Sequence, residues 1–347
     1  MLNIGVIGMG DVSEVHLSAI RKNPNASLTA VCDIDPSMKK IVPTVPFYTD
    51  YREMLQKESL DCVHICLPHY LHYTVTKACA ENGVHVLLEK PLARSADEGM
   101  DLVKLEEQYK HIKICVCFQN RLDETFVKLK QLVDSGEYGK VIGIKGVVTW
   151  YRPKTYYDKK SWRGKMKQSG GGVLINQAIH TIDLMQLIGG EIHTIRGSID
   201  TLFDYGYEVE DTAMANIQFK NGATGLLFAT LTYATNSSVE LQVHLEKGEL
   251  MIKDNILTAM NNEGEEKRIM GNRIFPVSDK DVNRNHTKLI NHFYSCIMTN
   301  SDDYIHAKSA QSTMEIIDAI RLSSEQKQIV HLDGFRQHLK KCKNKEN

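Results

Sequence analysis

Hydrophobic and polar residues follow two different patterns along this chain of 347 residues. Up to about residue 118, short apolar runs take turns with stretches in which apolar residues recur at helical spacing. The apolar runs cover residues 2–7, 28–33, 63–67, 84–88 and 112–118. Such alternation predicts parallel strands that are joined by right-handed helical crossovers.

Beyond residue 120 the runs are longer and are typical of strands joined by short turns. They cover residues 141–150, 212–219, 224–232 and 239–245, and Lys220-Asn221-Gly222 predicts a hairpin between the second and third. Helices are expected near residues 125–135, 287–298 and 307–325. We therefore predict an α/β domain over residues 1–120 and an α+β domain over residues 121–335, with a large, mostly antiparallel open sheet. The lysine-rich residues 336–347 are expected to form a frayed tail.

A glycine-containing turn directly follows the first strand. Gly8 permits a tight turn, Gly10 lets backbone approach a pyrophosphate, and Ser13 stands where a third glycine is usual. Because a helical pattern follows, the context fits a dinucleotide fingerprint. Asp33 ends the next strand, where a carboxylate can accept hydrogen bonds from ribose hydroxyls and repel a 2′-phosphate. The sequence thus favours NAD over NADP, and the alternative for Asp33 is a turn or cap acid.

The strand over residues 84–88 ends in Glu89, Lys90 and Pro91. Proline cannot donate to a sheet ladder and disfavours helix for the residue before it, so the strand stops here. Lys90 therefore lies at the carboxyl end of a strand, where open α/β sheets bind their ligands. It is a candidate proton-transfer group, and the alternative is a surface ion pair at a turn.

A glycine run, Gly170 to Gly172, precedes one helix that we predict over residues 173–185. This helix is apolar almost all round, which is typical of a buried helix. Asn176, His180 and Asp183 nevertheless fall within about 60° of one another around the helix axis. A polar stripe on a buried helix needs partners, either within the protein or in a ligand pocket.

Composition narrows the function classes. The net charge of −1 gives no electrostatic case for nucleic acid or an acidic membrane. No secretory signal and no apolar run of roughly 18 residues is visible, so no membrane partner and a cytoplasmic location are expected. The eight cysteines lack C-x-x-C spacing, and no metal is predicted because most histidines lack ligand spacing. Buried, reduced thiols are expected at Cys32, Cys62, Cys66, Cys115 and Cys117.

Together these features resemble the glucose-fructose oxidoreductase, inositol dehydrogenase and rhizopine-catabolism family (Gfo/Idh/MocA). The similarity runs from Ile4 to about Leu332. It rests on Gly8-Met9-Gly10, Asp33, Leu67-Pro68-His69-Tyr70-Leu71-His72, Glu89-Lys90-Pro91, Gly170 to Asp183 and Val209-Glu210-Asp211-Thr212-Ala213. The resemblance implies an N-terminal Rossmann domain, NAD or NADP, a sugar, inositol or sugar-derivative substrate, and a homodimer or homotetramer formed through the C-terminal sheet.

The resemblance also implies the roles of particular residues. Lys90 and His180 take catalytic positions, and Asn176 stands at a third catalytic position where the family usually has aspartate. Cofactor contacts are expected from Gly8, Met9, Gly10, Asp11, Val12, Asp33, Leu67, Pro68, Glu89, Lys90 and Gln119. Substrate contacts are expected from Lys90, Tyr156, Arg163, Asn176 and His180.

We expect His180 to remove a hydroxyl proton while hydride passes to C4 of the nicotinamide. Lys90 hydrogen-bonds the same oxygen and relays its proton. We expect Asn176 to position the substrate. An amide can hold a substrate hydroxyl, but it has no carboxylate that could raise the basicity of the imidazole. Two alternatives are an NAD-assisted glycosidase, which releases sugar without net NADH, and a dinucleotide-binding regulator without turnover.

Several polar residues have a structural interpretation beside a functional one. Gln119 either contacts the nicotinamide or caps a strand end. Arg163 and Tyr156 either line a sugar site in the basic, aromatic loop 151–167 or pack that loop. Structural roles are expected for Arg121, Asp183, His16 and His72, with a ligand contact as the alternative for Asp183.

Overall fold

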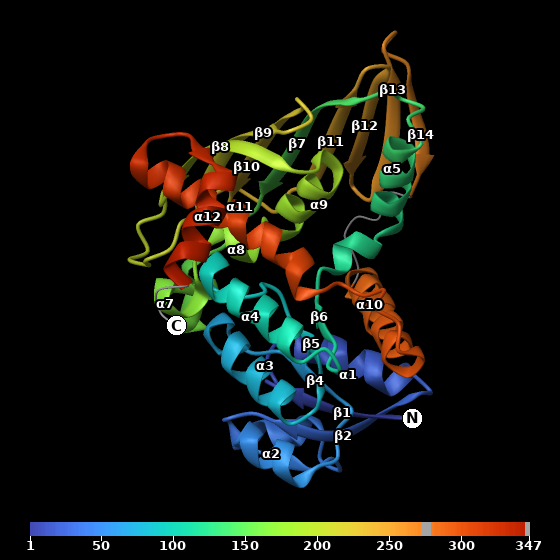
Figure 1. The fold of residues 1–347 in the computed structure, drawn as a ribbon, viewed down its shortest axis with the longest axis vertical. Helices are drawn as coiled ribbons and strands as arrows, with labels where there is room; N and C mark the ends of the chain where they lie inside the picture. The colour runs from blue at the N-terminus through green and yellow to red at the C-terminus, as the bar shows by residue number, and fades with distance from the viewer. Residues whose placement is uncertain (272–278, 344–347) are drawn as a thin grey trace. The chain divides into compact units, whose positions relative to one another are not determined.

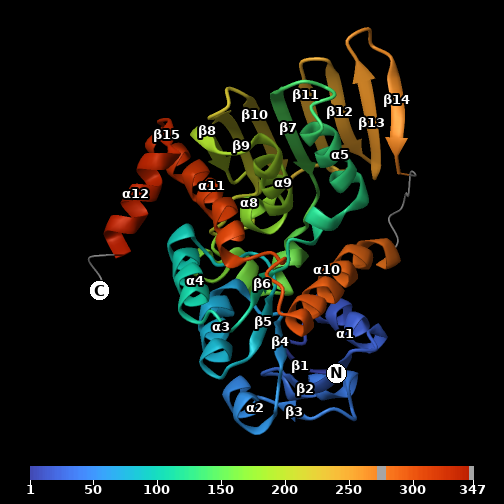
Figure 2. The ribbon, with the colours of Figure 1, turned by 45° about the vertical axis from the view of Figure 1, so that its right-hand side comes forward.

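The computed structural model describes residues 1–271 and 279–343, and Figures 1 and 2 show its ribbon. The chain forms two compact units. The first consists of Met1–Arg94, Glu98–Gln119 and Asp279–Gln311, and the second of Ser95–Asp97, Asn120–Ser278 and Ser312–Asn347, as far as these are described.

The first unit is built on a parallel sheet of six strands in the order β3-β2-β1-β4-β5-β6. The strands are β1 (Leu2–Ile7), β2 (Ala26–Cys32), β3 (Phe47–Tyr48), β4 (Cys62–Ile65), β5 (His85–Leu88) and β6 (Ile114–Val116). Strands β4, β5 and β6 are almost entirely buried, as expected for a parallel sheet covered on both faces. The strand order reverses between β1 and β4, the point at which such sheets bind ligands.

Helices and short 3₁₀ turns join or follow these strands, which confirms the predicted alternation. The helices are α1 (Ser13–Lys22), α2 (Tyr51–Lys57), α3 (His72–Glu81), α4 (Ala96–Gln108) and α10 (Asp279–Thr299). The 3₁₀ turns are η1 (Pro36–Ile41), η2 (His69–Leu71) and η3 (Gln119–Leu122). α10, although distant in sequence, packs beside α1 (Figure 2).

The second unit is built on a nine-stranded sheet in the order β14-β13-β12-β11-β7-β10-β9-β8-β15. The strands are β7 (Val141–Thr149), β8 (Ile192–Asp200), β9 (Thr212–Phe219), β10 (Thr224–Thr230), β11 (Glu240–Leu245), β12 (Gly248–Lys253), β13 (Ile256–Asn261), β14 (Glu266–Met270) and β15 (Val330–His331). The helical segments are α5 (Glu124–Asp134), α6 (Lys154–Asp158), η4 (Ser161–Gly164), α7 (Met166–Ser169), α8 (Val173–Asn176), α9 (Ile179–Gly189), α11 (Ala307–Gln326) and α12 (Leu332–Lys343).

The two faces of the nine-stranded sheet differ in burial. On β7, Ile144 and Val148 are buried, and a Cβ on Gly146 between them would lie 2.5 Å from the sulfur of Met185 on α9. Helices α5, α8 and α9 therefore lie against this face (Figures 1 and 2). Residues of the opposite parity on β7 are only half-buried, so that face is more open to solvent.

The pairing that the sequence predicts is confirmed, and the sheet also contains one parallel pair. β9 and β10 form the predicted antiparallel hairpin, with Gly222 at φ +91° in its turn. β7 and β10, however, pair in parallel, so the sheet is mixed. A parallel neighbour needs a crossover connection, and the helices and strands between residues 150 and 223 provide one. Five strands of this sheet were not predicted from the sequence, namely β8, β12, β13, β14 and β15.

The predicted domain boundaries differ from the compact units. Residues 279–311 belong to the first unit, although we predict them in the second domain. The apolar side of α10, with Leu289, Ile290 and Phe293, is buried there, and helical periodicity does not say which sheet a helix joins. Within the predicted tail, α12 continues to Lys343 because it packs against β8, and residues 344–347 lie outside the described part.

No helix within residues 1–271 and 279–343 is long and apolar enough to span a bilayer. The structure buries Cys32, Cys62, Cys66, Cys79, Cys115, Cys117 and Cys296 and joins none of these seven in a disulfide, in agreement with the predicted buried thiols.

Candidate active site

The turn after β1 is pressed against the chain that follows β4. Gly8 has φ +91°, and a Cβ there would lie 2.5 Å from the carbonyl oxygen of Cys66, so only glycine fits. A Cβ on Gly10 would instead point into open space. Its absence leaves backbone accessible at the start of α1, where the N–H groups of a helix can meet a phosphate. The turn thus fits the pyrophosphate of a dinucleotide.

Asp33 follows β2, and its carboxylate is bonded to the glycine turn. The backbone N–H of Met9 donates to Oδ2 at 2.7 Å, and that of Asp35 donates to Oδ1 at 2.9 Å. A carboxylate has about four acceptor positions, so further donors can still bind. Asp33 is therefore a turn acid that also keeps a negative charge beside the predicted cofactor turn.

Lys90 lies in the turn after β5, where its cis peptide bond to Pro91 follows. His72, the first residue of α3, links this turn to the one after β4. Its Nδ1 lies 2.7 Å from the carbonyl oxygen of Pro91, and its Nε2 lies 3.0 Å from that of Leu67. Burial lowers the pKa of His72 although both carbonyls favour the protonated ring. These contacts agree with the structural role expected of His72.

A buried polar group, which we call the Glu89 cluster, consists of His16, His64, Glu89, His286 and Tyr294. Each member is less than a tenth exposed. Oε1 of Glu89 lies 2.9 Å from Nε2 of His16 and 3.5 Å from Nε2 of His286. Oε2 accepts a hydrogen bond of 3.2 Å from the backbone N–H of Lys90. Nδ1 of His16 contacts Nδ1 of His64 at 2.9 Å, and Nε2 of His64 contacts the Tyr294 hydroxyl at 2.9 Å.

The cluster holds a charged carboxylate in the interior. Burial alone would raise the pKa of Glu89, but hydrogen bonds from His16 and His286 outweigh it and hold the pKa well below its usual value. Burial, together with the charge of His16, lowers the pKa of His64. A buried carboxylate that is bonded by imidazoles fixes the backbone of the next residue, Lys90.

The sequence did not predict this cluster. His286 and Tyr294 reach it from α10, about 200 residues after Glu89, and no local pattern links them. His64 lies inside an otherwise apolar strand, which was the available signal.

His16, Glu89 and Cys117 each offer one potential metal ligand, and these atoms lie within 4.8 Å of one another. No other such group occurs within the residues that the structure describes. The 2.9 Å between His16 and Glu89 is that of an ordinary hydrogen bond. The absence of a metal site stays a prediction.

The helix predicted over residues 173–185 is broken, so that prediction is wrong. α8 ends at Asn176 and α9 begins at Ile179. The backbone N–H groups of Gln177 and Ala178 both donate to the carbonyl oxygen of Val173, at 3.1 and 2.8 Å. The hydrogen-bond register therefore slips by one residue, as in a π-bulge. An apolar pattern does not record such a slip.

The slip places two amides on one tyrosine. Asn176 Nδ2 and Gln177 Nε2 donate to the hydroxyl of Tyr156 on α6, at 3.0 and 3.1 Å. The structure thus brings together two predicted substrate residues, Asn176 and Tyr156, and adds Gln177. His180, half-buried, is the second residue of α9.

Asp183 anchors the same helix. Its carboxylate accepts two hydrogen bonds from Arg121, at 2.6 and 2.8 Å, and one from the Thr313 hydroxyl at 2.9 Å. Asp183 is 1% exposed. The pair agrees with the structural roles expected of Arg121 and Asp183, and it lies one helical turn from His180.

The glycine run holds the start of α8 against the chain that leads into β9. A Cβ on Gly172 would lie 1.8 Å from the carbonyl oxygen of Glu210, so a side chain has no room there. The N–H groups of Val173 and Leu174 donate to the backbone oxygen and to Oε1 of Glu210, at 3.0 and 3.2 Å. The Gly170–Asp183 and Val209–Ala213 motifs therefore support each other structurally.

Two guanidinium groups lie over the ring of Tyr156. Cζ of Arg163 is 4.3 Å from the ring centroid and Cζ of Arg152 is 5.5 Å from it. Arg163 also donates to the backbone oxygen of Tyr156 at 3.2 Å. Arg152 was not singled out by sequence reasoning, although the basic loop that contains it was.

The remaining predicted cofactor residues lie in the segments that follow β1, β4 and β6. Asp11 and Val12 complete the glycine turn, Leu67 and Pro68 follow β4, and Gln119 opens η3 after β6. All predicted cofactor residues belong to the first unit. Tyr156, Arg163, Asn176 and His180 belong to the second.

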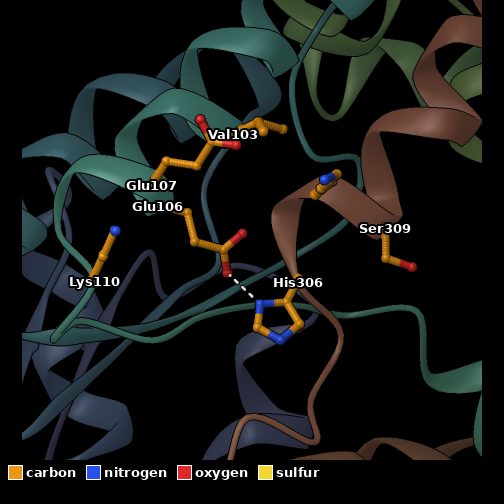
Figure 3. A pocket seen from close by; sticks show the side chains of 7 residues that line it. Val103, Glu106, Glu107, Lys110, His306 and Ser309 are labelled. Atoms are coloured by element: carbon orange, nitrogen blue, oxygen red, sulfur yellow. Dashed lines mark hydrogen bonds and ion pairs between the residues drawn. The ribbon is translucent and has the colours of Figure 1, made fainter.

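A separate pocket of about 540 Å³ in the first unit contains none of these residues. Figure 3 shows its lining from α4 and the start of α11, with the contact between His306 and Glu106 dashed. Nδ1 of His306 lies 2.9 Å from Oε1 of Glu106. Burial raises the pKa of Glu106 despite this contact.

Two family models match the chain. Residues 2–118 match the oxidoreductase family with an NAD-binding Rossmann fold, and residues 126–251 match the GFO/IDH/MocA C-terminal domain. The chain belongs to the Gfo/Idh/MocA family. It is an NAD-binding oxidoreductase of that family, and its six-stranded unit is the NAD-binding domain.

Similar proteins include two inositol dehydrogenases. The scyllo-inositol 2-dehydrogenase (NAD(+)) of Bacillus subtilis is 28% identical over 260 residues, which cover 71% of this chain and 72% of that protein. The myo-inositol 2-dehydrogenase of Thermotoga maritima is 26% identical over 265 residues, covering 74% and 76%. Among solved structures, the WlbA dehydrogenase of Chromobacterium violaceum in complex with NADH and UDP-GlcNAcA is 25% identical, with a TM-score of 0.84 and 95% of each chain covered.

Proposed function

We propose that the chain is an NAD-dependent dehydrogenase that acts on a CH–OH group of a sugar, an inositol or a sugar derivative, with Lys90 and His180 handling the proton. The names of the similar dehydrogenases support this substrate class. The observation that carries the proposal is that each proton-transfer side chain sits on a rigid support. Glu89 bonds the backbone of Lys90, and Asp183 anchors the helix of His180.

Bound NAD supplies the hydride acceptor. Histidine changes its charge near neutral pH, which suits His180 to take the hydroxyl proton. Lys90 hydrogen-bonds the same oxygen and relays the proton. Asn176 and Tyr156, already bonded to each other, orient the substrate.

We propose NAD rather than NADP because of Asp33. Its carboxylate lies beside the glycine turn, bonded to the N–H of Met9, and its charge would repel a 2′-phosphate. The NAD(+) in the name of the Bacillus subtilis relative supports this preference.

We also propose a homodimer or homotetramer that forms through the open face of the nine-stranded sheet. Met214 on β9 and Leu226 on β10 lie on this face, and each is 47% exposed. Apolar side chains that are exposed together favour an interface. Light scattering should show an oligomer that Leu226→Lys dissociates; a wild-type monomer contradicts this part.

The proposed activity is tested by incubating the purified protein and NAD with cyclic polyols, aldoses and sugar derivatives. We expect NADH fluorescence to rise in proportion to the oxidised sugar. Sugar release from a glycoside without net NADH would identify a glycosidase instead. Binding of NAD without turnover of any compound would identify a regulator.

A further inference from the structure

The loop over residues 151–167 carries an excess of positive charge. It contains seven lysines and arginines and one acid, Asp158, whereas the whole chain has 42 cations and 43 acids. Asp158 is exposed and accepts a hydrogen bond of 2.7 Å from the Tyr207 hydroxyl. The loop therefore does not neutralise its own charge.

Arg152, within this loop, is half-buried, and its hydrogen-bond partners are neutral. It donates to the backbone oxygen of Tyr151 at 2.8 Å and to Oδ1 of Asn236 at 3.0 Å, and its Cζ is 5.0 Å from the ring centroid of Trp150. In residues 1–271 and 279–343, Arg152 forms no ion pair with a carboxylate. Burial lowers the pKa of Arg152, and the neighbouring charge of Arg163 lowers it further.

Two like charges beside one ring repel each other, so an anion between them would be stabilised by both. The ring in question, Tyr156, offers a further donor. Its hydroxyl accepts hydrogen bonds from Asn176 and Gln177, which leaves its own hydrogen for a ligand. Since Asn176 is a proposed substrate residue, an anion here would belong to the substrate itself.

We infer that the substrate carries a carboxylate or a phosphate, which Arg152 and Arg163 bind through their forked N–H donors. This inference deepens the proposed function and rests on it. All the residues involved belong to the second unit. The alternative is that both arginines only pack the loop by stacking on aromatic rings.

The two tryptophans of the chain are natural reporters for this site. Trp150 lies 5.0 Å from Cζ of Arg152, and Trp162 lies 5.9 Å from Cζ of Arg163. Tryptophan emission of the protein loaded with NADH, which cannot accept a hydride from an alcohol, therefore measures binding without any turnover. The probes are D-glucuronate, D-galacturonate, D-glucose 6-phosphate and myo-inositol 1-phosphate, each compared with its neutral parent.

We expect at least one anionic probe to bind at least about tenfold more tightly than its parent, because hydrogen bonds to charged groups are the stronger ones. Preference for the sugar acids identifies a carboxylate, and preference for the sugar esters identifies a phosphate. Equal affinity within every pair overturns the inference.

Arg152→Gln should weaken binding of the preferred anion about tenfold or more and leave its neutral parent unaffected. Lys159→Gln removes an exposed cation from the same loop and should change affinity less than about twofold. Arg152→Lys keeps the positive charge but lacks the forked N–H donors of a guanidinium group. Its affinity for the anion should therefore lie between those of Arg152→Gln and Lys159→Gln. Equal behaviour of Arg152→Gln and Lys159→Gln overturns the inference.

Failure of this inference is distinguishable from failure of the proposed function. Anion binding without NADH formation from any probe overturns the dehydrogenase proposal. NADH formation from neutral sugars, with no preference for their anionic partners, overturns the anion site.

Discussion

The Glu89 cluster of the first unit and the loop over residues 151–167 of the second unit handle charge in opposite ways. In the Glu89 cluster, the carboxylate lies in the interior, and histidines from two elements, α1 and α10, bond it. Around Tyr156, two guanidinium groups lie half-buried, and the contacts of Arg152 are neutral.

We interpret this difference as one between holding a side chain of the protein in position and recognising a ligand. A buried charge is tolerated only when its partners belong to the protein, so the Glu89 cluster is suited to holding Lys90 in place. A half-buried cation without a protein carboxylate is suited to a partner that arrives from solvent. The first arrangement should govern stability and the second should govern substrate affinity.

The largest effect should come from the two proton-transfer groups, Lys90 beside Glu89 and His180 on the helix that Asp183 anchors. Lys90→Ala or His180→Ala should lower kcat by about 10²–10⁴-fold, the usual loss of general acid–base catalysis. Lys104→Ala, an exposed lysine on α4, is the control and should keep kcat. Steady-state NADH formation measures this, and wild-type kcat in both variants would refute the catalytic assignment.

Glu89→Gln should destabilise the fold by about 3–5 kcal/mol, because it breaks a buried, hydrogen-bonded charge pair. Arg152→Gln should change the free energy of unfolding far less, since that side chain is half-exposed. Urea denaturation of both variants compares the two clusters directly. Similar losses in the free energy of unfolding for both variants would contradict the distinction between holding a side chain in position and recognising a ligand.

Acid should weaken the first unit before it affects the second. The pKa of His64 is lowered in the fold, so below about pH 6.5 the unfolded chain binds a proton that the folded chain does not. Stability is then full above about pH 6.5 and falls as the pH drops, by at most about 1.4 kcal/mol per pH unit for each proton. His72 and His85, also with lowered pKa values, add to this loss.

Glu89 should add a second loss at lower pH. Its folded pKa is depressed, so its contribution is present above about pH 4.3 and disappears as the pH falls toward the folded value. Urea titrations between pH 8 and pH 3.5 should show both losses in the free energy of unfolding. His64→Gln should reduce the loss that begins below about pH 6.5. A free energy of unfolding that stays constant from pH 8 to pH 5 would contradict the neutral histidines.

The smallest effect concerns the cofactor. NADPH should bind about tenfold more weakly than NADH, because the Asp33 carboxylate repels the additional phosphate. Asp33→Asn should narrow this ratio, whereas Asp35→Asn, with an exposed carboxyl, should leave it unchanged. Dissociation constants from NADH and NADPH fluorescence measure the ratio, and equal wild-type affinities would count against Asp33.

Elements with a strong local signal were predictable. The turn at Gly8 and Gly10 needs only a strand, two glycines and a helix in succession. The hairpin at Asn221 and Gly222 is likewise a local event, and both are present. The break after Asn176 was not predictable, because one slipped hydrogen bond leaves the apolar pattern unchanged.

The sequence by itself determined which side chains are available for chemistry and on which kind of element each lies. Lys90 ends a strand because proline stops the ladder, and His180 lies on an apolar helix because its neighbours must be buried. Only the tertiary structure decided which distant groups meet. His286 joins Glu89, and Asn176 joins Tyr156, because packing brings separate segments into contact, and such contacts have no period that a sequence can display.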